Sequence, residues 1–208
     1  MIAPSQTVLD VGCGAGNLAK ELVKEKCLVT GLDIDPKVTR TAAKYYREIV
    51  IGDIEDQLTL RKLNKKKFDA IVFSDVLEHL KDPENVLKNL VKFLEASGKV
   101  IISVPNIAFL TNRLLALFGR FDYTDWGIMD RTHLRFFTKK SISSLIENAG
   151  LEIEKFDYVG NFTQLPFYMR TLHPIFGGRN WWGKVEYKIT GLWPEGLAVQ
   201  FLLLCRKK

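Results

Sequence analysis

Two groups of residues in this sequence have types and spacings that suggest chemistry: a glycine-rich turn and a series of acids. The turn follows an apolar segment and consists of Asp10, Val11, Gly12, Cys13, Gly14, Ala15 and Gly16. Glycine lets a backbone turn tightly and approach a ligand closely. The unpaired N–H groups of a following helix can then face that ligand. The turn predicts a nucleotide-cofactor site, and an ordinary strand-to-helix turn is the alternative.

An aspartate stands at the end of each of four apolar segments that the pattern predicts as strands. These residues are Asp10, Asp33, Asp53 and Asp75. Ligands of open α/β sheets bind outside the carboxyl ends of the strands, so we expect the four acids to line a site there. We expect Asp33 to accept hydrogen bonds from ribose hydroxyls and Asp53 to accept one from an adenine amino group, with Ile34 and Ile54 on either side of the ring. Each acid alone could be a helix N-cap, but all four behind a glycine turn favour a cofactor site.

The arrangement of the turn indicates which cofactor it suits. Its glycines alternate and an acid precedes them, which differs from the Gly-x-Gly-x-x-Gly pattern of dinucleotide sites. The carboxylates of Asp10 and Asp75 would repel a pyrophosphate but would suit a cationic sulfonium and an α-ammonium group. We therefore predict a cationic ligand.

The elements that must position these residues alternate along the chain. Strands are predicted over 8–11, 28–33, 48–51, 68–73, 99–104, 151–159 and 198–205. Helices are predicted over 15–26, from Asp35-Pro36, from Asp82-Pro83 to Ser97-Gly98, over 107–118 and, after Thr138, over 139–149. Residues 120–137 are predicted as a loop and 160–195 as irregular. This alternation indicates an α/β protein, a Rossmann-like parallel sheet with helices on both faces.

On these residues the chain resembles the class I S-adenosylmethionine-dependent methyltransferases. Residues 8–16 are similar to the first motif of that family, 31–35 to the ribose-binding acid, 52–53 to the adenine-side motif, and 68–79 to the fourth motif. The resemblance implies a three-layer sandwich with strand order 3-2-1-4-5-7-6 and strand seven antiparallel. It implies S-adenosylmethionine as cofactor and S-adenosylhomocysteine as product. The cofactor-binding residues it predicts are Asp10, Gly12, Cys13, Gly14, Gly16, Asp33, Ile34, Asp53, Ile54, Ser74 and Asp75.

Two stretches, 75–80 and 129–138, bear on the methyl acceptor. Both resemble a branch that contains ubiquinone-biosynthesis O-methyltransferases and small bacterial enzymes found with polysaccharide and lipid-linked glycan synthesis. Asp130-Arg131 stand ahead of Thr132 in place of that branch's usual residue, which argues against a quinol precursor. We therefore expect O-methylation of a small-molecule, sugar or lipid-linked hydroxyl.

Histidines are the candidates for proton transfer. His133 is the predicted catalytic base, because an imidazole titrates near neutral pH. The alternative is that it holds a loop together through Asp130. His79, next to Glu78, is interpreted as bracing the cofactor loop. No metal ligand is assigned, and a divalent-metal site formed by Glu78, His79 and His133 is left as an alternative. His173 is interpreted as local structure.

Two other classes of function compete with an O-methyltransferase. One is a protein of this fold that binds the cofactor without turnover. The other is a nucleic-acid methyltransferase, because the chain has a net charge of +6 and a pI near 9.2. The Asn/Asp-Pro-Pro-Tyr/Phe motif of base amino-methylation is absent after the fourth strand, where Ser74-Asp75-Val76-Leu77 stand. This argues against a nucleic-acid acceptor.

The length and composition of the chain predict its domain organisation and its surroundings in the cell. The 208 residues predict a single methyltransferase domain, 1–208, in which 106–137 and 160–195 are acceptor-side or lid insertions. No apolar run reaches the roughly 18 residues of a membrane span. No signal peptide is recognised, and the three cysteines predict reduced thiols in a cytoplasmic protein. The apolar stretch 107–121 is interpreted as a helix on the sheet edge, a lid, or a peripheral contact with a membrane. We expect a monomer or homodimer.

Residues 1–6 alone precede the first strand, although the family usually places a helix there. Either the chain is truncated, or 107–137 and the later insert cover the cofactor.

Overall fold

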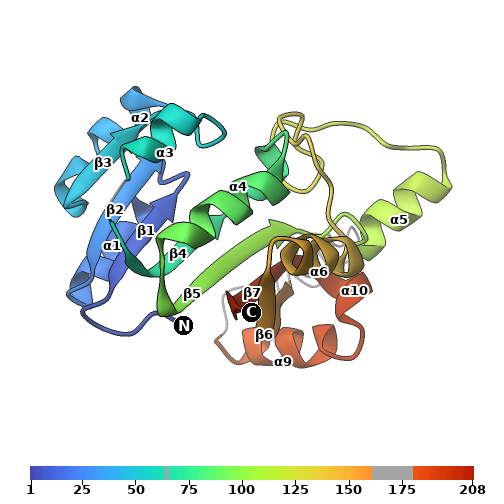
Figure 1. Cartoon of the computed structure of the whole chain (residues 1–208). Coiled ribbons are helices and arrows are strands. Elements are labelled where there is room, and N and C mark those ends of the chain that lie inside the picture. The colour runs from blue at the N-terminus through green and yellow to red at the C-terminus, as the bar shows by residue number, and fades with distance from the viewer. Residues whose placement is uncertain (64–65, 161–179) are drawn as a thin grey trace.

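One mostly parallel sheet forms the centre of the molecule (Figure 1). The computed structural model describes residues 1–63, 66–160 and 180–208. The strands are β1 (Thr7–Val11), β2 (Leu28–Asp33), β3 (Glu48–Ile51), β4 (Phe68–Ser74), β5 (Leu94–Pro105), β6 (Leu151–Gly160) and β7 (Ala198–Lys207). Their order is β3-β2-β1-β4-β5-β7-β6, and β7 is antiparallel to both β5 and β6. The predicted fold class and strand order are confirmed.

Helices follow the strands. The α-helices are α1 (Asn17–Lys24), α2 (Pro36–Arg40), α3 (Gln57–Arg61), α4 (Pro83–Leu90), α5 (Leu110–Leu117), α6 (Lys139–Asn148), α9 (Asn180–Thr190) and α10 (Pro194–Leu197). The short 3₁₀ helices are η1 (Ala43–Tyr45), η2 (Leu77–His79) and η3 (Val91–Phe93). The predicted starts of three helices are confirmed, since Asp35, Asp82 and Thr138 each accept a backbone N–H of the first turn.

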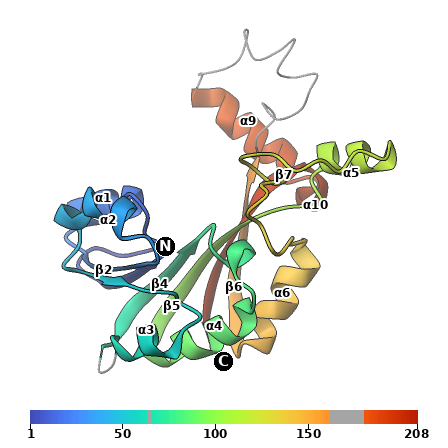
Figure 2. The same ribbon diagram turned by 90° about the horizontal axis from the view of Figure 1, so that it is seen from above.

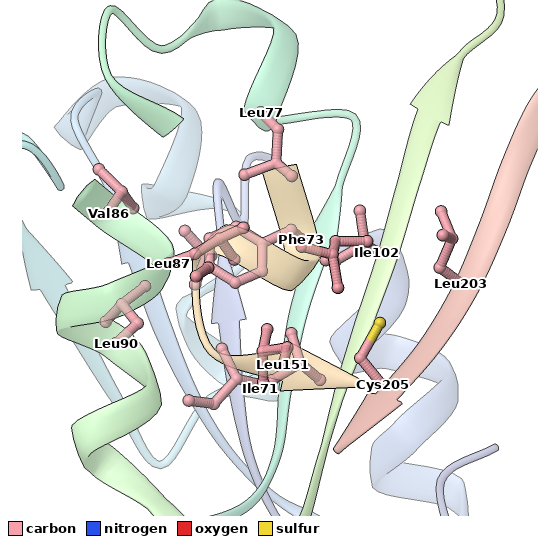
Figure 3. Packing of buried hydrophobic residues seen from close by; sticks show 14 of the residues in the cluster. Ile71, Phe73, Leu77, Val86, Leu87, Leu90, Ile102, Leu151, Leu203 and Cys205 are labelled. Atoms are coloured by element: carbon pink, nitrogen blue, oxygen red, sulfur yellow. The ribbon is translucent and has the colours of Figure 1, made fainter. Parts of the chain in front are cut away.

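Both faces of the sheet are buried, and the side chains of each strand point alternately to one face and the other. On one face Ile71 and Phe73 of β4 pack against Leu87 and Leu90 of α4, as Figure 3 shows from close by. On the other face the cluster includes Val72 of β4 and the residues around α1. Turning the molecule shows the helices distributed around the sheet (Figure 2). This three-layer packing fixes the carboxyl ends of β1 to β4 relative to one another.

Two predicted boundaries were wrong. Helix α4 ends at Leu90, the 3₁₀ helix η3 follows it over Val91–Phe93, and Leu94 then begins β5 by pairing with Phe68. The pairing resumes between Ala70 and Lys99, so residues 95–98 bulge out of register. Residues 160–195 were predicted as irregular, yet 180–190 form α9. The aromatic residues at 162, 167, 168 and 176, and His173, lie outside the described residues.

Helix α5 extends away from the sheet, although Phe109 just before it is buried with Val199 of β7. Figures 1 and 2 place α5 at the opposite end of the molecule from α2. None of its residues is buried, and Leu117 and Phe118 are each 78% exposed. The expectation of a helix packed on the sheet edge thus holds for the start of the stretch 107–121, where Phe109 is buried with Val199 of β7, and not for the end of α5. A lid or a membrane contact stays a prediction. Within the described part of the chain, no helix has the length and apolar character needed to cross a bilayer.

Candidate active site

A cavity of about 350 Å³ lies at the carboxyl ends of β1 to β4. Six of the predicted cofactor-binding residues lie in its wall. They are Gly12, Asp33, Ile34, Asp53, Ile54 and Asp75. Val76, His79, Leu80 and Lys81, which follow β4, complete the wall with Val11, Leu32, Gly52 and Glu55. We call this space the donor cavity.

The glycine turn is held against Asp33. Gly14 has a φ of +47°, a left-handed conformation that glycine adopts without a steric penalty. Its N–H donates a hydrogen bond to Oδ2 of Asp33 at 2.7 Å, and the N–H of Asp35 donates to Oδ1 at 2.9 Å. Both carboxylate oxygens of Asp33 are thereby oriented, and each keeps a lone pair that can accept a further hydrogen bond.

Asp10 lies beneath the turn and not in the cavity wall. It is 2% exposed and accepts a hydrogen bond from the hydroxyl of Tyr46. Burial raises the pKa of Asp10 to about 6; the bond from Tyr46 opposes this effect, and the charge of Asp33 adds to it. The role of Tyr46 could not be predicted from the sequence, because its partner Asp10 is 36 residues away.

The other predicted residues belong to the turn or to the end of β4. Cys13, Gly14, Gly16 and Ser74 are not in the cavity wall. Burial raises the pKa of the Cys13 thiol to about 12, with the charges of Asp10 and Asp33 adding to the effect, so the thiol stays protonated. Cys13, Gly14 and Gly16 form part of the turn and Ser74 ends β4, and their assignment to cofactor binding stays a prediction.

The chemistry of the donor cavity fits S-adenosylmethionine. Asp33, Asp53 and Asp75 give it carboxylates, which suit a cation that carries hydroxyl and amino groups. Ile34 is 66% exposed and leaves an apolar surface open beside the acids, whereas Ile54 is 7% exposed. The amide of Gly14 is bound to a carboxylate and is not free for a phosphate. A phosphate ligand would meet repulsion here.

A second cavity, of about 340 Å³, adjoins the first. Its wall consists of Asp75, Glu78, Pro105, Gly127, Ile128, His133, Val159, Val199 and Gln200. We call it the acceptor cavity. Asp75 belongs to both walls, so the two cavities meet at this residue.

Asp75 is held in an unusual conformation at that junction. Its φ is +54°, which is uncommon for a residue with a side chain. Its N–H donates to the carbonyl oxygen and to Oγ of Ser103, both at 3.2 Å. Oδ1 accepts a hydrogen bond from Nε2 of Gln200 at 2.5 Å and one from Oγ of Ser103 at 3.2 Å. Backbone strain of this kind persists where surrounding contacts over-determine it, often at functional sites.

Sequence reasoning missed Gln200, although one signal was present. Gln200 is a polar residue in the otherwise apolar segment 198–205. Because β7 runs antiparallel, its first residues lie beside the carboxyl end of β5, where Gln200 pairs with Pro105. The segment 106–137 contributes Gly127, Ile128 and His133 to the same cavity.

His133 is half-buried, and its Nδ1 lies 3.1 Å from the carbonyl oxygen of Ile128. Because a carbonyl oxygen only accepts, Nδ1 carries the proton and Nε2 keeps a lone pair. Burial lowers the pKa of His133, and nearby His79 lowers it further, so the ring is largely uncharged at neutral pH. The side chain of Asp130 does not bond this ring; it accepts from the N–H and Oγ1 of Thr132.

Glu78 and His79 lie on η2, next to His133. The rings of His79 and His133 meet edge to face with 4.8 Å between centroids. Nδ1 of His79 is 3.2 Å from the carbonyl oxygen of Thr132. Glu78 is fully buried, and burial, with a smaller contribution from the charge of Asp75, raises its pKa to about 8.

The chain is similar to known methyltransferases in sequence. A family model described as a methyltransferase domain matches residues 2–155. The ubiquinone biosynthesis O-methyltransferase of Rickettsia bellii is 30% identical over 154 residues, which cover 71% of this chain and 62% of that protein. The one from Coxiella burnetii is 31% identical over 104 residues, which cover 49% of this chain and 44% of that protein. The match therefore spans less than two thirds of each relative's length.

Solved structures share the fold. A putative methyltransferase in complex with the Haloferax volcanii Trm112 activator has a TM-score of 0.66 at 15% identity, covering 99% of this chain and 84% of that one. A methyltransferase from Archaeoglobus fulgidus has a TM-score of 0.64 at 19% identity, and the match covers 97% of this chain and 86% of that one. The magnesium protoporphyrin IX methyltransferase of Synechocystis, with bound S-adenosylhomocysteine, has a TM-score of 0.63 at 16% identity. The match covers 99% of this chain and 75% of that one.

Proposed function

The chain belongs to the S-adenosylmethionine-dependent methyltransferase family, and we propose that it transfers the methyl group of that cofactor to a hydroxyl oxygen of a small molecule, a sugar or a lipid-linked glycan. One observation carries the proposal: the donor cavity and the acceptor cavity meet at Asp75. A methyl group can pass between two ligands only if their binding sites adjoin.

The donor cavity has a group for each part of the cofactor. We assign the ribose hydroxyls to Asp33, the adenine amino group to Asp53, and the faces of the ring to Ile34 and Ile54. The cationic part is assigned to Asp75, at the junction. When bound, S-adenosylmethionine supplies a methyl group that its sulfonium has already activated.

The protein must then position the acceptor and allow its hydroxyl to lose a proton. His133 is the residue to which we assign this second task, because its uncharged ring keeps a lone pair on Nε2 and the residue lines the acceptor cavity. Gln200 and Ser103 keep the carboxylate of Asp75 in place through their hydrogen bonds.

The size and chemistry of the acceptor cavity support a small acceptor group. A cavity of about 340 Å³ has room for one ring of a phenol or a sugar. The named activity of the relatives, O-methylation, agrees with a hydroxyl acceptor. The segment 106–137, which contributes three residues of the wall, is accordingly proposed to lie on the acceptor side.

A transfer assay tests the proposal. The protein is incubated with methyl-labelled S-adenosylmethionine and separate panels of phenols, free sugars and lipid-linked sugars. We expect label in one hydroxyl class as a methyl ether that survives alkali, which would hydrolyse a methyl ester. His133→Ala should lower kcat by about 100-fold or more, with unchanged cofactor affinity in calorimetry. Leu134→Ala, an exposed neighbour outside both cavity walls, is the control.

Two results would contradict the proposal. Cofactor binding without transfer to any panel would indicate a binding protein of this fold. Transfer to a nucleic-acid substrate alone would indicate the other class of methyltransferase.

A further inference from the structure

Glu55 joins two parts of the donor-cavity wall that belong to different βα units. It lies in the turn after β3, whereas Lys81 lies in the segment after β4, and both residues line the cavity. Strands β2 and β1 separate β3 from β4 in the sheet. Neighbouring strands lie about 4.8 Å apart, so the carboxyl ends of β3 and β4 are roughly 14 Å from each other. The sheet itself therefore does not hold the two segments together.

The side chain of Glu55 does hold them together. Oε1 accepts a hydrogen bond from the N–H of Asp82 at 2.8 Å, and Oε2 accepts one from the N–H of Lys81 at 3.3 Å. Both N–H groups stand at the start of α4, where the helix dipole favours a negative charge. Hydrogen bonds from backbone N–H groups to a carboxylate are strengthened by its charge. Glu55 thus closes the wall of the donor cavity between the two segments.

The backbone of Glu55 acts on Asp53, the residue assigned to the adenine amino group. The N–H of Glu55 donates to Oδ1 of Asp53 at 2.9 Å. The other oxygen, Oδ2, has no hydrogen-bond partner in the described part of the chain, and the side chain of Asp53 is exposed. Oδ2 is therefore open to a ligand, in an orientation that the N–H of Glu55 helps to set.

The segment after β4 is held from its other side by residues that precede α6. The guanidinium of Arg135 donates to the carbonyl oxygen of Lys81. The carbonyl oxygen of Glu78 accepts hydrogen bonds from the N–H groups of Leu134 and Arg135 at 2.8 and 2.9 Å. Among the described residues, Glu55 alone connects this segment by hydrogen bonds to the turn after β3. Loss of the Glu55 side chain would therefore release the adenine side of the segment and leave its acceptor side anchored.

We propose that Glu55 is a positioning residue for the adenine end of the cofactor, which keeps Asp53 and the segment around Lys81 at the spacing that the ring requires. The inference rests on the proposed assignment of the adenine amino group to Asp53. It concerns binding of the donor and holds for any acceptor. A wall that is already in place before the ligand arrives lowers the entropic cost of binding. The expected signature is a loss of affinity that depends on the amino group of adenine.

A thermodynamic cycle tests this role with two ligands that differ at one position. S-adenosylhomocysteine carries the 6-amino group, and S-inosylhomocysteine carries an oxo group there. Calorimetry gives the affinity of both ligands for the unmodified protein and for Glu55→Ala. We expect Glu55→Ala to weaken binding of S-adenosylhomocysteine by about tenfold, the order of one hydrogen bond to a charged group. Binding of S-inosylhomocysteine should weaken by less than about threefold, because the interaction at stake is already missing.

Two further measurements separate positioning from a general loss of structure. Glu55→Gln keeps one acceptor oxygen and should weaken binding of S-adenosylhomocysteine by only about threefold. Hydrogen exchange of single backbone N–H groups, followed by NMR, reports the bonds directly. Exchange at Lys81 and Asp82 should accelerate by at least about fivefold in Glu55→Ala. Exchange at Leu134, which is bonded to Glu78, should not change.

Asp82→Ala is the matched control. The side chain of Asp82 caps α4 by accepting from the N–H of Asn85 at 3.1 Å, and it lies outside both cavity walls. Alanine keeps the backbone N–H that Glu55 binds. This substitution should lower the thermal stability of the protein, since a helix cap is lost. It should leave both ligand affinities within about twofold of the unmodified protein.

Equal losses for the two ligands in Glu55→Ala, or unchanged affinity for both, would overturn the proposal. Asp53→Ala tests the assignment on which it rests and should remove the preference for S-adenosylhomocysteine. If Asp53→Ala removes this preference and Glu55→Ala does not, the role of Glu55 is wrong and the proposed function stands. If Asp53→Ala leaves the preference intact, the adenine assignment is wrong and this inference falls with it. Absence of methyl transfer would contradict the proposed function without changing what these affinities say about Glu55.

Discussion

The hydroxyl of Tyr46 donates a hydrogen bond to the carboxylate of Asp10, with 2.7 Å between Oη and Oδ2. Both residues are buried beneath the glycine turn. The ring of Tyr46 also approaches Gly16, where an added Cβ would lie 3.2 Å from Cε2 of the ring and 2.7 Å from Cβ of Ala42. Tyr46 thus supports the glycine turn from beneath, through its hydrogen bond to Asp10 and its contact with Gly16.

Replacing Tyr46 tests that support. Tyr46→Phe leaves the carboxylate of Asp10 buried without its donor, so at pH 7.5 we expect the free energy of unfolding to fall by about 1–3 kcal/mol. Denaturant titration measures the change. Tyr45→Phe removes a hydroxyl from the neighbouring position and should change stability by less than about 0.5 kcal/mol. Equal losses in the two variants would contradict the assigned role.

The raised pKa of Asp10 predicts a pH-dependent stability. The folded protein holds this proton up to a pKa of about 6, whereas the unfolded carboxyl titrates near 3.8. The folded state therefore binds more protons between these values, and the free energy of unfolding decreases as pH rises from about 4 to about 6. The decrease is roughly 3 kcal/mol, since each unit of pKa corresponds to about 1.4 kcal/mol.

The measurement compares unfolding curves of the unmodified protein and Asp10→Asn across pH 4 to 7. The difference in stability between the two proteins should change over this interval and level off above it. A difference that is constant with pH would show that Asp10 has an ordinary pKa.

A matched pair of glycine substitutions tests the donor site. Gly14 (φ +47°) and Gly150 (φ +80°) both have a left-handed backbone conformation. A Cβ added at Gly14 would meet only the carbonyl oxygen of Gly12, at 3.9 Å, and one added at Gly150 would meet nothing within 4 Å. Alanine at either position should cost about 1–2 kcal/mol of stability. Only Gly14→Ala should weaken S-adenosylmethionine binding, by at least about tenfold, because the cofactor must approach this turn closely.

Calorimetry with the cofactor, alongside thermal unfolding, provides the readout. Cofactor affinity that is the same in both glycine variants would remove Gly14 from the proposed donor site.

Gln200 is predicted to act through Asp75. Gln200→Leu removes the hydrogen bond to Oδ1 of Asp75 and lines the acceptor cavity with an apolar group. We expect a lower kcat/KM for the acceptor, by about tenfold, the equivalent of a hydrogen bond worth about 1.4 kcal/mol. Cofactor affinity should change by less than about threefold. Gln57→Leu, at the start of α3 and outside both cavity walls, is the control. A Gln200→Leu enzyme with normal acceptor kinetics would contradict this role.

Much of the fold could be predicted from the sequence because the signals are local. Each of the first four strands is an apolar segment followed closely by an acid, and aspartates cap the helices after β2, β3 and β4. The strand order followed from the resemblance of these motifs. The end of α4 could not be predicted in this way. The periodicity of Val91 and Leu94 continues the helix, but Leu94 instead pairs with Phe68, a contact 26 residues away.

By itself the sequence determined that a glycine turn and the acids at 10, 33, 53 and 75 would lie at one edge of the sheet, because parallel strands bring their carboxyl ends together. Only the tertiary structure decided which acid faces the cavity. Asp33, Asp53 and Asp75 do, whereas Asp10 turns inward and accepts a hydrogen bond from the distant Tyr46.

The acceptor side depended on the tertiary structure throughout. Gln200 reaches Asp75 across 125 residues because β7 is antiparallel, and His133 reaches His79 across 54 because backbone hydrogen bonds to Glu78 fix the path of an otherwise irregular segment. Such contacts have no period or motif in the sequence. They arise only after the sheet has formed and its edge residues determine where the later segments can pack.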